Sequence, residues 1–535
     1  MGFGKVLNLA LSALLLFGCN GVIGGGADLE PSSAAEPAAP RGELDGGLPV
    51  DPDSDAGQVA LPDADSMPDA SVPPPPDCNP ATAAPMPVRA LRISDVAINQ
   101  GVSIALVDDA ASVNGRQAPV VTKREGVIRV FVEPQAGWQA RDVIARLTLS
   151  GTSREVRMRV TDASSATKLA STINFALSPG DIAQNSTFSV ELLEVEPCVT
   201  YTGAVNGSRY PSSNTQSLGA ESAPGPFRIV LVRVRYQADG SNRTPVTDGT
   251  TVARFTERMY GMFPLADFQV SVRQAPLDFD RTIGADGEGW SDLLSECLSL
   301  RANDSAGSNS YYYCAVRPSE EAFDFCSQGC VAGLGPVPRA GDTFNRAAIG
   351  LLYEDGSETF VHEIGHTLGL SHAPCGGASG ADPDFPYSDG GIGVLGYDLA
   401  AQQLLDTQYR DIMGYCGPSW ISDYNYDLLY ERLVAVTASS ASSLKRVATS
   451  LALRPVVVDI DGALTIGDTV WIDGAPLGDP VAAEWIDAAG QSEVLDAILV
   501  RVSHLPGGII YVPEMESPPE MIRIPGYGTA TFQRR

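Results

Sequence analysis

The sequence predicts a multidomain chain in which a β-sandwich is followed by an α/β (α+β) domain and then by a β-rich domain. In residues 78–222, short runs such as 156–160 and 188–192 alternate apolar and polar side chains between Gly, Pro, Ser and Asn turns. That period of two is typical of antiparallel sheets. In residues 223–440, strand-like and helix-like runs alternate, which favours an α/β layer. In residues 441–535, strand-like runs return with Gly and Pro between them.

The elements of the last two domains follow from the spacing of their apolar residues. The first helix is expected after a strand at 227–236, because Val252, Phe255 and Met259 recur at helical spacing before Pro264. Further helices are expected around 290–297 and 426–433. The other expected strands are 268–272, 349–353, 456–460, 470–472, 498–502 and 509–512.

Three of the four histidines lie within eleven residues, at His362, His366 and His372. His362 and His366 are four residues apart, so on a helix both imidazoles face the same way and can hold one metal ion. Gly369 permits the left-handed turn that ends such a helix and returns His372 as a third ligand. Three neutral nitrogen ligands suit one catalytic zinc ion and leave a position for water. Glu363 is then the expected general base.

The alternative is a helix whose histidines only pack or face solvent. The complete pattern HExxHxxGxxH disfavours it. A cap for the helix is expected from Asp355 or Ser357, which precede it.

Residues 362–372, taken together with 411–416, resemble the metzincin clan of zinc endopeptidases. In this resemblance Met413 matches the methionine turn beneath the metal, and Tyr415 matches a tyrosine that stabilises the transition state in the astacin-like and serralysin-like branches. The alternative is that both are ordinary core and rim residues. The resemblance covers about 225–435 in outline and implies a metzincin-like catalytic domain. Residues 371–417 also look like secreted bacterial metalloproteases of the mucinase-like type, from which no substrate is inherited.

The amino terminus predicts export. An apolar run at 6–17 follows Lys5 and ends before Cys19, which resembles a bacterial lipoprotein signal peptide at 1–18 with a lipidated Cys19. Phe17 departs from that pattern, so an ordinary secretory signal is the alternative. Residues 19–77 are rich in Pro, Ala and Asp, and from residue 20 onward hold twelve acidic residues against one arginine. They predict a disordered tether and a lipid-anchored position on the outer membrane or cell surface, or else secretion.

The other eight cysteines predict four disulfides, as is usual in exported proteins. Among the possible pairings, we prefer Cys78 with Cys198, bracketing one domain, and Cys375 with Cys416, closing the loop between the histidines and the methionine turn. Cys78 could instead block the metal in a latent form, and a disulfide is favoured over that role.

The net charge of −29 excludes a nucleic-acid partner and disfavours contact with anionic lipid beyond the anchor itself. The chain is expected to be a monomer. Calcium is possible but unsupported, because Asp459, Asp461 and Asp468 lack the spacing of a calcium loop. His504, far from the other histidines in sequence, is expected to be a surface or turn residue.

These features together predict an exported zinc endopeptidase. Its substrates would be extracellular proteins or glycoproteins, hydrolysed by a zinc-activated water with Glu363 as general base. The alternative is a cell-surface binding or adhesion lipoprotein that retains the zinc site. A third possibility is hydrolysis of a non-peptide amide.

Overall fold

A computed structural model describes residues 78–532, apart from 81, 340, 343, 444–449, 474–475 and 517–518. The expected signal peptide, the tether and Cys19 therefore lie outside the described residues. The described chain is β-rich, as predicted, with seven sheets and few α-helices. No helix in this part of the chain is long and apolar enough to span a membrane. The helices are α1 (Gly249–Met262), α2 (Trp290–Asn303), α3 (Ala322–Cys326), α4 (Ser357–Thr367) and α5 (Asp423–Ser443).

The amino-terminal unit consists of two antiparallel sheets that enclose an apolar core. β6 shows the physical basis, because every second side chain along it is buried. The first sheet has the order β3 (Ala111–Ser112), β2 (Ser103–Asp108), β1 (Leu91–Asn99), β5 (Gly126–Pro134) and β8 (Ile173–Leu177). The second has the order β10 (Arg209–Tyr210), β9 (Thr187–Glu194), β6 (Arg141–Leu149) and β7 (Thr152–Val160), with β11 (Gln216–Ser217) beside β9. The short strands β4 (Val120–Val121) and β12 (Ala220–Glu221) pair separately.

The central unit is built on a six-stranded sheet whose long strands are parallel. Only β17, at the edge, runs antiparallel to its neighbour. The sheet has the order β14 (Phe268–Val272), β13 (Phe227–Tyr236), β16 (Ser310–Val316), β18 (Ala347–Leu351) and β17 (Gly333–Leu334), with β15 (Leu277–Phe279) also paired to β13. Two small pairs follow α4, namely β19 (Gly396–Asp398) with β20 (Gln403–Leu405), and β21 (Arg410–Asp411) with β22 (Ser419–Trp420).

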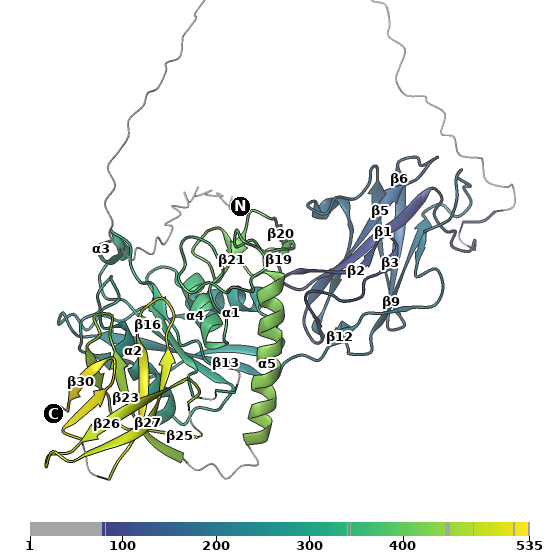
Figure 1. The fold of residues 1–535 in the computed structure, drawn as a ribbon. Coiled ribbons are helices and arrows are strands. Elements are labelled where there is room, and N and C mark those ends of the chain that lie inside the picture. The colour runs from purple at the N-terminus through teal and green to yellow at the C-terminus, as the bar shows by residue number, and fades with distance from the viewer. Residues whose placement is uncertain are drawn as a thin grey trace, which may run out of the picture.

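The central sheet is covered on both faces. Ile229 and Leu231 of β13 join the core that contains α1 and α4, whereas Val232 and Val234 join the core that contains α2. Figure 1 shows α4 and α1 together, away from α2. A sheet covered in this way gives α4 a rigid support.

The carboxy-terminal unit is one eight-stranded sheet. Its end strands β24 and β30 contact each other, so it curls into a nearly closed barrel. The order is β24 (Leu464–Ile466), β23 (Ser450–Val458), β28 (Gly508–Pro513), β27 (Ser492–Arg501), β26 (Asp479–Ile486), β29 (Met521–Ile524) and β30 (Gly528–Thr531), with β25 (Val470–Asp473) also paired to β23.

The carboxy-terminal sheet is not an independent appendage. Val500 and Ile509 share one apolar core with α2 and with the central sheet. The buried Tyr511 ring packs edge-on against Phe344 at 5.2 Å between centroids, and its hydroxyl donates to Asn345 Oδ1 at 3.3 Å. The two units are therefore held as one body, which fixes the loop between β27 and β28 relative to the central sheet.

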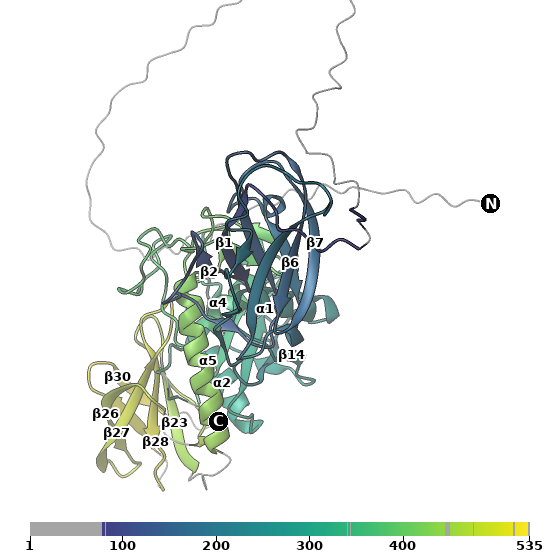
Figure 2. The same cartoon turned by 90° about the vertical axis from the view of Figure 1, so that its right-hand side faces the viewer.

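The amino-terminal unit is joined to the central unit by buried polar contacts. Arg124 is fully buried, donates to the Leu265 carbonyl at 2.7 Å and lies over the Tyr260 ring. Trp420 donates its indole N–H to the Gly101 carbonyl at 2.8 Å. Figures 1 and 2 show this unit on the side of the molecule away from the carboxy-terminal sheet.

The shared core predicts a large effect of Tyr511→Ala. Removing a buried aromatic side chain costs about 3–5 kcal/mol in the free energy of unfolding. Val494→Ala is the matched control on the same sheet: the Val494 side chain is 70% exposed, so its loss should change that free energy by less than about 0.5 kcal/mol. Unfolding in urea measures the free energy of unfolding of both variants. An early, separate unfolding step confined to residues 450–532 in the variant would contradict a shared core.

Candidate metal centre

The first two histidines are placed by α4. Asp355 Oδ1 accepts the Ser357 amide at the start of this helix, at 2.9 Å. His362 and His366 lie one turn apart on it, and both are buried. The helix ends at Thr367, and the chain reverses at Gly369, whose φ of 88° is a conformation that glycine adopts without strain. The chain then turns back and brings His372 beside the helix.

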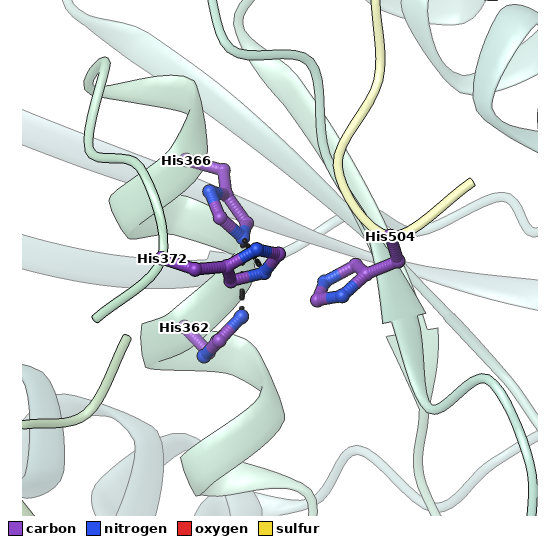
Figure 3. A group of neighbouring side chains, drawn as sticks. All are labelled: His362, His366, His372 and His504. Carbon is purple, nitrogen blue, oxygen red and sulfur yellow. Dashed lines mark hydrogen bonds between the residues drawn. The ribbon is translucent and has the colours of Figure 1, made fainter. Parts of the chain in front are cut away.

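The three imidazoles point their Nε2 atoms at one another. His366 Nε2 lies 3.1 Å from His362 Nε2 and 3.1 Å from His372 Nε2. Each ring uses its other nitrogen for a backbone carbonyl, and the Nδ1–H groups of His362, His366 and His372 donate at 2.7, 2.8 and 2.6 Å respectively. The accepting carbonyls belong to Ile412, Leu370 and Ser379. Figure 3 shows the three rings converging from α4 and the segment after it.

This hydrogen-bond pattern fits a metal ion. A neutral imidazole that donates through Nδ1 keeps an unprotonated lone pair on Nε2. Because none of the three Nε2 atoms carries a proton, their lone pairs repel one another at this distance. A cation placed between them would remove that repulsion, because each lone pair would then bind it. Three imidazoles are a donor set that suits zinc. Burial lowers the pKa of His362 and of His372 to about 4 and holds the pKa of His366 well below its ordinary value, so all three are neutral at pH 7.

The segment around Met413 supports the first ligand from below. The fully buried Asp411 accepts the Met413 amide at 2.8 Å and the Asn425 side-chain amide at 2.9 Å. That turn presents the Ile412 carbonyl to His362. Met413 packs directly against Gly365 of α4, where a Cβ would lie only 2.7 Å from the methionine sulfur. Glycine at 365 therefore lets the methionine sulfur lie directly against the helix.

The third ligand is tied to the same turn. The Ala373 amide donates to the Met413 carbonyl at 3.0 Å, and the Tyr415 amide donates to the Cys375 carbonyl at 3.1 Å. A disulfide joins Cys375 to Cys416 across these segments. The other three disulfides are Cys78–Cys198, Cys297–Cys314 and Cys326–Cys330, so the eight cysteines form four bonds.

Glu363 lies beside the histidines with its carboxylate almost fully enclosed. Its side chain is 2% exposed. Burial raises its pKa to about 7, the most suitable range for a group that takes and returns a proton near neutral pH. The edge strand leaves room for it only because residue 333 is glycine, since a Cβ there would lie 2.6 Å from Glu363.

Tyr415 also lies beside the histidines. Its hydroxyl lies 3.3 Å from His372 Nε2. The six residues His362, Glu363, His366, His372, Met413 and Tyr415, which the sequence placed in one site, are thus gathered around one point.

His504 lies in a turn, as one expected alternative had it, but it is not a surface residue and it is not apart from the other histidines. Its side chain is 13% exposed, its Nε2 lies 2.9 Å from Glu363 Oε1, and its Nδ1 accepts a hydrogen bond from the Tyr415 hydroxyl. The ligand atoms of all four histidines lie within 4.8 Å of one another. Figure 3 shows His504 facing the other three from a separate segment. The reason is tertiary: the carboxy-terminal sheet packs against α2 and directs its β27–β28 turn into the site.

Other sequence expectations concern places away from this centre. Asp461 Oδ1 accepts the Ala463 amide, as turn residues do. Asp459 Oδ2 instead accepts the amide of Gly289, which precedes α2. Among the described residues, the four histidines form the one group of three or more His, Cys, Asp or Glu side chains that could hold a metal ion. The carboxylate of Asp411 and the glycine at 365 were not singled out from the sequence. The position of Asp411 two residues before Met413 was the only available signal for it.

Comparison with known proteins adds one specific likeness. Residues 346–416 match the family model of Peptidase M66. This segment includes α4, all three closely spaced histidines and the Met413 turn, so the match supports a metallopeptidase. No curated protein matches the chain. A solved structure described as "Structure of a chaperone-substrate complex" matches with a TM-score of 0.23 and 10% identity, over 50% of this chain and 39% of that one.

The buried imidazoles predict an unusual pH dependence of metal binding. Because the folded protein holds His362 and His372 neutral down to a pKa of about 4, protons should not compete with zinc between pH 8 and pH 5. Affinity should fall only as the pH drops through about 4, whereas ligands with the ordinary pKa near 6.5 would lose it from pH 6.5 downward.

Zinc titration of the whole protein against a competing chelator measures this profile. The control is a synthetic peptide of residues 355–375, whose imidazoles are in water. Its affinity for zinc should fall below pH 6.5. Identical profiles for peptide and protein would contradict the effect of burial.

Proposed function

We propose that this chain is a zinc endopeptidase of the metzincin type. The observation that carries the proposal is the convergence of three Nε2 lone pairs, with the Glu363 carboxylate and the Tyr415 hydroxyl beside them. Three histidines with an adjacent glutamate are the ligand set and base of that chemistry. Further support comes from the helix, the glycine turn and the methionine turn, which meet in the order that the metzincin resemblance implies.

The side chains have separate tasks in peptide-bond hydrolysis. Zinc held by His362, His366 and His372 would polarise the substrate carbonyl and make a bound water acidic. Glu363 accepts a proton from the attacking water and delivers it to the leaving amine, and its raised pKa suits both transfers. Tyr415 donates its O–H to the substrate oxygen as negative charge develops there. The rigid anchoring of each group by buried neighbours lowers the reorganisation needed during the reaction.

The proposed setting is extracellular, with polypeptides or glycoproteins as substrates. Four disulfides support an oxidising compartment. The proposal includes anchoring through a lipidated Cys19 at the bacterial cell envelope, with secretion as the alternative. For the competing proposal of an adhesion lipoprotein, a site that only binds metal has no need of a buried glutamate with a raised pKa, so Glu363 favours the enzyme.

Glu363→Gln should lower kcat/KM on casein or a quenched peptide by about 10²–10⁴-fold, because it removes the proton acceptor. The zinc content of the variant should stay at that of the wild type, since Glu363 is not a ligand. Glu358→Gln is the matched control, because Glu358 lies on the same helix with an exposed side chain paired to Arg258. Equal activity of Glu363→Gln and wild type would refute the mechanism, and an inert wild type with full zinc would redirect the search to non-peptide amides.

Tyr415→Phe should lower kcat by about 10²–10³-fold while changing KM little, because the lost hydroxyl acts mainly on the transition state. Tyr430→Phe is the control: it removes a hydroxyl that donates to the Ser222 carbonyl, far from the metal centre. Steady-state kinetics on one peptide measure both variants. A rise in KM with unchanged kcat would show that Tyr415 only binds substrate.

A further inference from the structure

The turn between β27 and β28 enters the metal centre. We call residues 502–507 the site turn. Val502 forms an isolated antiparallel bridge with Pro336, directly after the edge strand β17. The Ser503 amide donates to the Gly335 carbonyl at 2.8 Å, and the Gly335 amide donates to Ser503 Oγ at 3.1 Å. The backbone that continues from β17 past Glu363 is therefore already paired.

The tip of the site turn is His504, which engages both groups that the proposed reaction requires. Its Nε2 contacts Glu363 Oε1 and its Nδ1 accepts from the Tyr415 hydroxyl. The neighbouring Ser503 Oγ lies 3.4 Å from Glu363 Oε2. The backbone at His504 has φ = 63°, which is uncommon for a residue with a side chain and costs free energy that its surroundings must offset.

We propose that the site turn is an internal occupant of the active site, with the His504 imidazole in the place of the substrate's reacting peptide group. The inference rests on the proposed function. In hydrolysis, Glu363 must reach the attacking water and Tyr415 must reach the carbonyl oxygen. One imidazole takes both contacts, so substrate and His504 exclude each other.

The paired backbone points to the same competition. An exposed sheet edge binds an extended peptide by adding a strand. Here the site turn makes that type of contact with Gly335 and Pro336. An extended polypeptide substrate would replace these hydrogen bonds with its own. The geometry thus identifies an extended peptide strand as the ligand that opens the site.

The site turn can move without unfolding the carboxy-terminal unit. Its flanking strands stay in the core shared with α2. Gly507, with φ of 112°, ends the turn directly before β28, and glycine at this junction allows the backbone to rotate without a side-chain clash. Within the site turn, Val502 belongs to that core and stays with the strands. The apolar anchor next to His504 is Leu505, which lies so close to Gly287 that a Cβ there would be 2.6 Å from a leucine methyl group.

His504→Ala in the full chain tests the inference. Zinc content should remain one ion per chain, and the dissociation constant of a peptide hydroxamate should fall at least tenfold, with a similar rise in kcat/KM. A tenfold change corresponds to an open fraction below about one tenth in the wild type, because a closed state weakens apparent affinity by the open fraction. Calorimetry measures hydroxamate binding independently of turnover.

Two further variants complete the design. Leu505→Ala keeps the imidazole but removes the anchor, and should shift the hydroxamate dissociation constant in the same direction by a smaller factor. Gln491→Ala is the matched control, because Gln491 lies in the exposed turn at the opposite end of β27 and should change nothing.

The outcomes separate the inference from the proposed function. If His504→Ala keeps its zinc but loses activity and gains no hydroxamate affinity, His504 assists the chemistry and the occupant model is overturned. Loss of zinc from His504→Ala alone would make it a metal ligand and would overturn the model equally. If wild type and variant both bind no zinc, the proposed function itself fails.

Discussion

The structure of the site depends on three imidazole lone pairs held at one point. Burial lowers the pKa of the imidazoles, so protons do not compete with a metal ion for the lone pairs. A backbone carbonyl fixes the orientation of each ring by accepting from its Nδ1–H group. Those carbonyls come from the methionine turn, from the turn that follows α4 and from the segment after His372. A shift in any of these segments would rotate a ring and separate the nitrogens. The surrounding contacts, including the buried Asp411 and the Cys375–Cys416 disulfide, therefore act on the metal centre by holding backbone.

The buried environment that keeps the histidines neutral also determines the pKa of Glu363. Its carboxylate is enclosed by the edge strand, by α4 and by the site turn, so burial raises its pKa toward neutrality. The same enclosure brings His504 and Tyr415 into contact. Proton transfer and access to the site are thus coupled through one set of packed groups. A displaced site turn would expose Glu363 to water and change both together.

The third unit of the chain determines that coupling. A barrel attached by a flexible linker could not direct one imidazole to within hydrogen-bond distance of Glu363. The core that Val500 and Tyr511 share with α2 makes the unit part of the same body. Stability and access to the metal centre consequently depend on one interface, and no described residue of the amino-terminal unit belongs to its core.

The sequence by itself determined the local features: the helical spacing of His362 and His366, the turn at Gly369, and the strand at 227–236, which is observed as β13. Each depends on residues a few positions apart, where backbone geometry leaves little choice. Only the tertiary structure decided that His504 joins the metal centre, 132 positions after His372. A lone histidine in a connection between two strands carries no local periodicity. Its place depends on which face of α2 the carboxy-terminal sheet covers, a choice made by packing among residues far apart in the chain.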